Sequence, residues 1–129
     1  MAMTRMQSPL GRALGLGSAK EGVQHWWRQR VSALALVPLV LWFVIAIIGL
    51  VGADRAALIA WIKSPFPAML LVLLLVTTFY HAALGLQVVI EDYIHGEAMR
   101  MAALLVMRLL CILFALRGVF AVLKLALSA

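Results

Sequence analysis

One histidine lies deep inside a long apolar stretch. His81 comes nine residues before Ile90, where that stretch ends, so in a helix it lies about 14 Å inside the span, close to the bilayer midplane. An ionisable side chain at that depth is costly, and a neutral imidazole can ligate a metal ion, haem iron included, while its other nitrogen donates a hydrogen bond. His81 is therefore the first candidate for a metal or cofactor ligand.

A glycine shares the helix face of His81. Gly85 follows four residues later, and its missing side chain would let a flat macrocycle or another helix approach closely. Alternatively, His81 hydrogen-bonds to a neighbouring helix and Gly85 only packs. This pair of residues leaves both interpretations open.

Asp92 and Tyr93 come eleven and twelve residues after His81. Eleven residues make about three helical turns, so Asp92 is expected on the His81 face, about 16 Å nearer the end of the span. A carboxylate and a phenol there could hydrogen-bond and protonate a lipophilic carbonyl compound at the lip of a pocket lined by His81. The alternative is a solvated acid beside an interfacial tyrosine.

Two polar residues mark the start of the first apolar stretch. Arg30 could pair with an anionic cofactor group, such as a haem propionate, or with a lipid phosphate. Ser32 could donate to a ligand or to its own helix. Further polar residues have simpler expectations: Arg108 snorkels or faces the bundle, Arg117 faces a partner or a polar cavity, and His25 and His95 are solvated at the boundaries.

The elements that position these residues are apolar helices. Of 129 residues, 66% are hydrophobic and 12% charged, and the mean hydropathy is +1.09, which excludes an ordinary soluble domain. Residues 31–52, 66–90 and 101–127 are each long enough to cross a bilayer. We therefore expect an all-α membrane protein with three transmembrane helices. Three helices give a thin wall for a pocket, which favours a multi-subunit helical bundle.

Basic residues predict the orientation of the chain. Residues 1–30 read as a basic, mostly irregular tail, followed by a transmembrane domain over 31–129 that contains a polar loop at 53–64 and a connector at 91–100. Five basic residues in the tail and one in the connector outnumber three on the other side. The positive-inside rule places the tail and the connector on the cytoplasmic or matrix side. The net charge of +6 therefore indicates topology and not nucleic-acid binding.

Two segments, 17–33 and 81–95, resemble the D-type hydrophobic membrane anchor subunit of succinate dehydrogenase, respiratory complex II. The second segment, HAALGLQVVIEDYIH, is the more specific, because it combines a histidine, a glycine four residues on and an Asp-Tyr pair eleven and twelve residues on. Chain length, the number of spans and the basic tail ending in R-x-S also agree. The likeness covers nearly the whole chain.

The resemblance implies roles for five residues. His81 would be an axial ligand of a haem b shared with a cytochrome b-type second anchor subunit, which supplies the other histidine. Tyr93, assisted by Asp92, would help form the ubiquinone site near the iron–sulfur subunit. Arg30 would lie near the haem propionates, and Ser32 stands where a small hydroxyl residue is usual.

The same resemblance implies a setting. The partners would be the flavoprotein, iron–sulfur and second anchor subunits of succinate dehydrogenase, together with membrane lipid. The chain would not be catalytic alone. It would lie in a bacterial inner membrane in preference to a mitochondrial one, with its N-terminus on the cytoplasmic side. Two alternatives remain open: a haem-free transporter with a proton relay through His81, Arg117 and Asp92, and a purely structural anchor.

Overall fold

A computed structural model of the chain describes residues 20–128, and this part is helical without strands. The helices are α2 (Lys20–Gly49), α3 (Arg55–Lys63), α4 (Pro65–Tyr93) and α5 (Glu97–Ala126). α2, α4 and α5 are each long and apolar enough to cross a membrane. The prediction of an all-α protein with three spans is confirmed.

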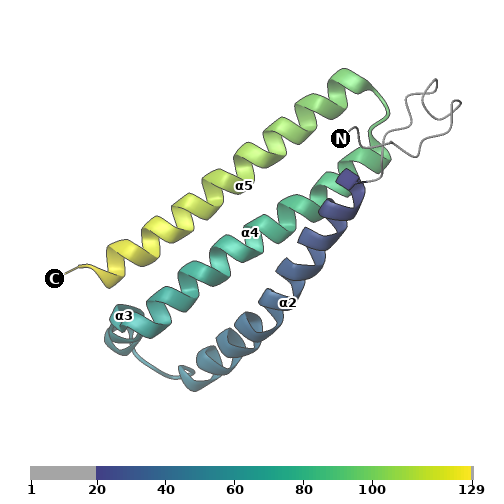
Figure 1. The fold of residues 1–129 in the computed structure, drawn as a ribbon. Helices are drawn as coiled ribbons and strands as arrows, with labels where there is room; N and C mark the ends of the chain where they lie inside the picture. Colours follow the sequence, from purple (N-terminus) through teal and green to yellow (C-terminus); the bar gives the residue numbers. More distant parts are fainter. Residues whose placement is uncertain (1–19, 129) are drawn as a thin grey trace, which may run out of the picture.

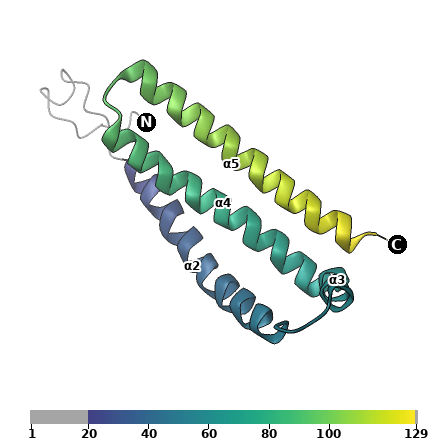
Figure 2. The same cartoon turned by 180° about the vertical axis from the view of Figure 1, so that it is seen from behind.

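Helix α4 is the centre of the bundle (Figures 1 and 2). It packs against α5 on one side and α2 on the other, whereas α2 and α5 do not contact each other within the described residues. The start of α2 and the α4–α5 connection lie at one end of the bundle, called here the α4–α5 end, and α3 lies at the opposite end. The surface of α4 between α2 and α5 is thus left without a covering helix.

The first helix begins earlier than predicted. α2 starts at Lys20 instead of Val31, so the prediction of irregular chain up to Arg30 is wrong for residues 20–30. One cause is local: Arg30 lies one turn after Trp26, with its guanidinium carbon 5.4 Å from the centre of the Trp26 ring, and such a cation–π pair favours the helix. Residues 1–19 of the predicted tail lie outside the described part. α2 continues through Pro38.

The connection between α2 and α4 contains a short helix where a polar loop was predicted. Asp54 is the N-cap of α3, and its carboxylate accepts a hydrogen bond from the Ala57 backbone N–H at 2.8 Å. Trp61 of α3 stacks on Trp42 of α2, with ring centroids 6.0 Å apart. The cap and the aromatic contact explain why this segment folds against the end of the bundle.

The connector between α4 and α5 is shorter than predicted. α4 continues to Tyr93 and α5 begins at Glu97, which leaves only Ile94–Gly96 between them, in place of 91–100. Asp92 and Tyr93 therefore belong to the last turn of α4. Because the helix is unbroken from His81 onward, the three-turn relation between His81 and Asp92 applies to it.

The bundle has almost no interior. Among the described residues, the buried apolar side chains are Leu39, Ala68, Leu84 and Met107, whereas most large apolar side chains are exposed. Lipid tails can cover such side chains.

Arg117 is also exposed, in the C-terminal half of α5. A guanidinium within a span needs a polar partner or must reach the interface.

Candidate functional site

His81 lies near the middle of α4 and contacts two polar side chains of α2. Its Nδ1 is 2.9 Å from the Ser32 hydroxyl oxygen, and its Nε2 is 3.4 Å from the amide nitrogen of Gln29. The Ser32 hydroxyl also donates to the backbone carbonyl oxygen of Gln29 at 3.0 Å. We call Gln29, Ser32 and His81 the histidine cluster. Ser32 thus contacts both its own helix and a possible ligand residue.

The hydrogen bonds of the histidine cluster are mutually consistent in one tautomer of His81. Ser32 has one hydroxyl proton, and it donates this proton to the Gln29 carbonyl. The Ser32 oxygen must then accept from Nδ1–H, which leaves Nε2 without a proton. Nε2 can accept from the Gln29 amide. In this tautomer Nε2 carries the lone pair of the ring, and that lone pair faces the Gln29 amide.

The contact of His81 with Ser32 is short, whereas its contact with Gln29 is long. Ser32 is only 5% exposed, and its bond to His81 is short. The Gln29 contact is near the upper limit for a hydrogen bond, and the amide oxygen of Gln29 is buried without a hydrogen-bond partner among the described residues. Ser32 holds the imidazole, whereas Gln29 only covers Nε2.

Gly85 faces the Gln29 side chain in this structure. A Cβ atom added at Gly85 would lie 3.5 Å from the Gln29 amide nitrogen, which is an ordinary van der Waals distance. The space expected for a macrocycle or another helix is therefore next to a polar side chain that is itself weakly bonded.

His81 could supply one ligand of a haem or metal site. In residues 20–128, no group of three or more His, Cys, Asp or Glu side chains could hold a metal ion. His81 offers one nitrogen ligand with its other nitrogen already bonded to Ser32, which is the usual arrangement of a metal-ligating histidine. Among the described residues, the hydrogen-bond partners of His81 are Ser32 and Gln29, and neither is a second histidine.

The other predicted site residues lie apart from the histidine cluster. Asp92 and Tyr93 are exposed in the last turn of α4, Tyr93 to 80%, and Arg30 is exposed on α2 above Trp26. None of these three hydrogen-bonds to His81 in the described part of the chain. The structure thus brings His81 and Ser32 together, and leaves the predicted lip residues facing outward at the α4–α5 end.

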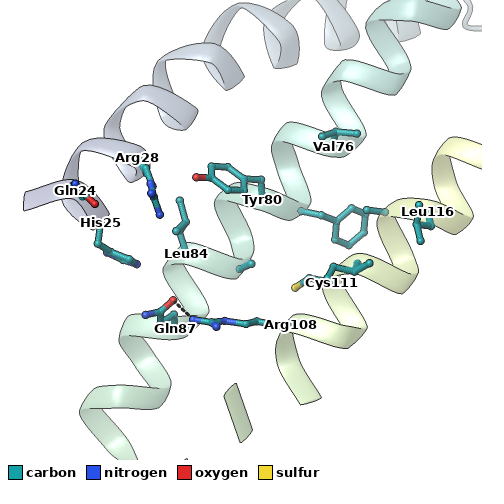
Figure 3. A pocket seen from close by; sticks show the side chains of 14 residues that line it. Gln24, His25, Arg28, Val76, Tyr80, Leu84, Gln87, Arg108, Cys111 and Leu116 are labelled. Atoms are coloured by element: carbon teal, nitrogen blue, oxygen red, sulfur yellow. Dashed lines mark hydrogen bonds between the residues drawn. The ribbon is translucent and has the colours of Figure 1, made fainter. Parts of the chain in front are cut away.

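A second polar region lies in a cavity of about 780 Å³ between α2, α4 and α5 (Figure 3). We call it the basic groove. Its lining includes residues that the sequence did not single out, and excludes His81, Asp92 and Tyr93. It is lined by Gln24, His25, Arg28, Val76, Phe79, Tyr80, Ala83, Leu84, Gln87, Arg108, Cys111, Ile112, Ala115 and Leu116.

The polar end of the basic groove contains a hydrogen-bonded chain and an unpartnered histidine. Arg108 donates to the amide oxygen of Gln87 at 3.1 Å, and the Gln87 amide donates to Glu91 at 2.8 Å. His25 is half-buried, and its Nε2 has no hydrogen-bond partner among the described side chains, those of residues 22–128. The expectation of a solvated His25 is therefore wrong, because α2 extends far enough to turn it into the groove. His95 is exposed, as expected.

A family model and the similar proteins described below all indicate the same family. Residues 4–115 match the family model of the succinate dehydrogenase/fumarate reductase transmembrane subunit. The succinate dehydrogenase hydrophobic membrane anchor subunit of Paracoccus denitrificans is 37% identical over 98 residues, which are 76% of each chain. The subunit of the same name from Rickettsia bellii is 37% identical over 102 residues, 79% of this chain and 82% of the relative.

A more distant relative extends the comparison. The succinate dehydrogenase membrane anchor subunit of Reclinomonas americana is 28% identical over 96 residues, 72% of this chain and 80% of the relative. The family-model match covers most of the chain, and the three-span fold agrees with it. The prediction from the sequence is confirmed: the chain belongs to the family of succinate dehydrogenase/fumarate reductase transmembrane subunits.

Proposed function

We propose that this chain anchors a succinate:quinone oxidoreductase in the membrane and supplies one axial ligand, His81, to a b-type haem shared with a second anchor subunit. The flavoprotein and iron–sulfur subunits would oxidise succinate and pass electrons to ubiquinone at the membrane. The complex would lie in a bacterial inner membrane with the α4–α5 end on the cytoplasmic side, because the positive-inside rule favours that side for a basic N-terminal segment.

The observation that carries this proposal is the contact between His81 and Ser32. An imidazole near the middle of a span, with Nδ1 2.9 Å from the Ser32 hydroxyl oxygen, would present the lone pair of Nε2 in a fixed direction. That is the form in which histidine binds haem iron. The weak Gln29 contact at 3.4 Å is one that a metal–nitrogen bond could replace.

Haem b, when bound, would accept and return single electrons. The residues of this chain would set the conditions for it. Ser32 would hold the His81 ring in one orientation, and Gln29 would have to leave Nε2. Arg30, two residues before Ser32 on α2, would pair with a propionate. The apolar side chains of the spans would exclude water from the site.

Tyr93 and Asp92 are proposed to bind the quinone. They lie exposed at the end of α4, where a lipophilic carbonyl compound can reach them from the bilayer and a soluble subunit can cover them. The Tyr93 hydroxyl would donate to a quinone oxygen, and Asp92 would accept from or orient the phenol. The redox change belongs to the cofactors and the quinone; this chain positions the quinone and donates hydrogen bonds.

His81→Ala tests the haem role. The purified wild-type complex should show the reduced-minus-oxidised absorption bands of a b-type haem, and the variant should lose them because one axial ligand is gone. His95→Ala is the matched control, since His95 is exposed in the α4–α5 connector. A wild-type complex without these bands, or bands that survive unchanged in His81→Ala, would contradict the proposal.

Tyr93→Phe tests the quinone role. We expect at least a tenfold loss of succinate-dependent quinone reduction, since general acid catalysis contributes about 10²–10⁴-fold. Succinate oxidation with an artificial soluble acceptor should be unchanged, because that reaction bypasses the membrane. Equal loss in both assays would show that Tyr93 only supports assembly.

The structural-anchor alternative also has support. Both ring nitrogens of His81 have contacts within this chain, as a packing histidine would. In that case His81→Ala would weaken the bundle but leave any haem spectrum unchanged. The proton-relay alternative has less support, because no hydrogen bond joins His81, Arg117 and Asp92 within the described residues.

A further inference from the structure

The basic groove changes in character along its length. At the α4–α5 end it is lined by Gln24, His25 and Arg28 of α2, Gln87 of α4 and Arg108 of α5. Further in, the lining is mainly apolar, with Val76 on α4 and Leu116 on α5, and Tyr80 and Cys111 are its polar members. These lie eleven residues from Gln87 and eight from Arg108, which is about 16 Å and 12 Å along the helices.

At the polar end, neither arginine pairs with a carboxylate among the side chains that the structure describes. Arg28 has no hydrogen-bond partner in the part of the chain that the structure describes, and Arg108 bonds only to a neutral amide, that of Gln87. The neighbouring acid, Glu91, is bonded by the same amide. The buried Nε2 of His25 is unpartnered. Figure 3 shows His25, Arg28 and Arg108 around one opening.

We propose that the basic groove binds one phospholipid, with its phosphate between Arg28 and Arg108 and an acyl chain along the apolar walls of α4 and α5. Guanidinium groups bind phosphate oxygens through paired, charge-assisted hydrogen bonds. His25 contributes a hydrogen bond to the headgroup. The groove's position agrees, because its polar end lies near Trp26 and Trp27, and tryptophan side chains favour the headgroup level of a membrane.

Other occupants fit the groove less well. A neutral quinone would leave two guanidinium groups uncompensated, and a free phosphate would leave the apolar walls uncovered. A helix of a partner subunit could cover the walls but would need acidic side chains at one end. A phospholipid supplies both the anionic group and the apolar chain. The cavity of about 780 Å³ is within the range of small-molecule sites.

Phospholipid retention by the purified complex tests the proposal. After exhaustive washing in detergent, phospholipid per complex is counted by native mass spectrometry. We expect wild type to retain one molecule that the double variant Arg28→Gln/Arg108→Gln loses, with about tenfold weaker retention for each guanidinium removed. Arg100→Gln is the matched control, because Arg100 lies at the same end of α5 but outside the groove, and it should retain lipid as wild type does.

A second variant keeps the charges and fills the space. Ala115→Phe narrows the apolar part of the groove, so it should also lower phospholipid retention, even if the double variant fails to assemble. A photo-crosslinking residue at position 115 should give a lipid adduct. Retention at the wild-type level in both Ala115→Phe and the double variant would overturn the proposal. An adduct at position 115 to another protein chain would also overturn it and assign the groove to a partner helix. None of these readouts depends on haem.

Discussion

Polar groups on the two sides of α4 differ in how far their hydrogen bonds are satisfied within the described residues. On the α2 side, the histidine cluster joins His81 to the side chains of Ser32 and Gln29, and Ser32 is buried. On the side between α2 and α5, the basic groove collects charged groups and leaves His25 Nε2 without a partner among the described residues. The first region is nearly complete within the chain, whereas the second requires something from outside.

Depth in the membrane explains the difference. His81 lies near the middle of its span, where a charge is most costly and a polar group needs a partner within the protein. The Arg108 backbone lies eleven residues from the start of α5 at Glu97, about 16 Å by helical rise. Its side chain reaches Gln87, which is only six residues, about 9 Å, from the end of α4, as an arginine that extends toward the headgroups does. In this bundle, a polar side chain without a hydrogen-bond partner among the described residues therefore indicates a position where an outside group could bind.

Ser32→Ala should disrupt the histidine cluster and cause the largest loss in the free energy of unfolding. The variant leaves the Nδ1–H of His81 without an acceptor, which costs about 1–3 kcal/mol for a buried donor. The free energy of unfolding of the complex in mixed micelles measures this loss, and it should not depend on added phospholipid. Ser32→Thr, which keeps the hydroxyl, should restore most of it.

Ser64→Ala is the matched control for that prediction. Ser64 is exposed, and its hydroxyl donates only to the Ala60 carbonyl at 3.2 Å. The loss expected there is less than about 0.5 kcal/mol. Equal effects at positions 32 and 64 would mean that the Ser32–His81 bond contributes nothing beyond a local helix contact.

Gln29→Leu should have a smaller effect and sharpen the comparison. The variant removes a long contact of 3.4 Å together with a buried amide oxygen that has no partner in the described part. Removing an unsatisfied group offsets the lost contact, so the free energy of unfolding should change by less than about 1 kcal/mol. A loss as large as that of Ser32→Ala would show that Gln29, too, holds the imidazole.

The sequence predicted the spans well because lipid imposes a simple requirement on length and composition. It failed at the element ends. The first helix begins at Lys20 because nothing in residues 20–30 stops a helix, although their charge suggested an irregular tail. α3 was read as a loop because it is short and polar at both ends, yet Asp54 followed by apolar residues was a usable N-cap signal.

The candidate site was predicted in part. His81 was identified from its depth alone, and Ser32 from its position near the first span. Gln29 was missed because the register between α2 and α4 is a property of packing that one sequence does not contain. The groove could have been anticipated on one side: His25 and Arg28 are three residues apart, and they share a face once α2 is extended. That α5 adds Arg108 to the same face depends on tertiary packing.

The most direct test of the central claim, that His81 Nε2 is a haem ligand, is a potentiometric titration of the haem bands in His81→Met. Methionine can replace histidine as an axial ligand, and Met/His ligation raises the reduction potential. The account predicts shifted absorption bands and a higher midpoint potential than wild type, with His95→Met unchanged. Bands and a midpoint potential identical to wild type in His81→Met would contradict it.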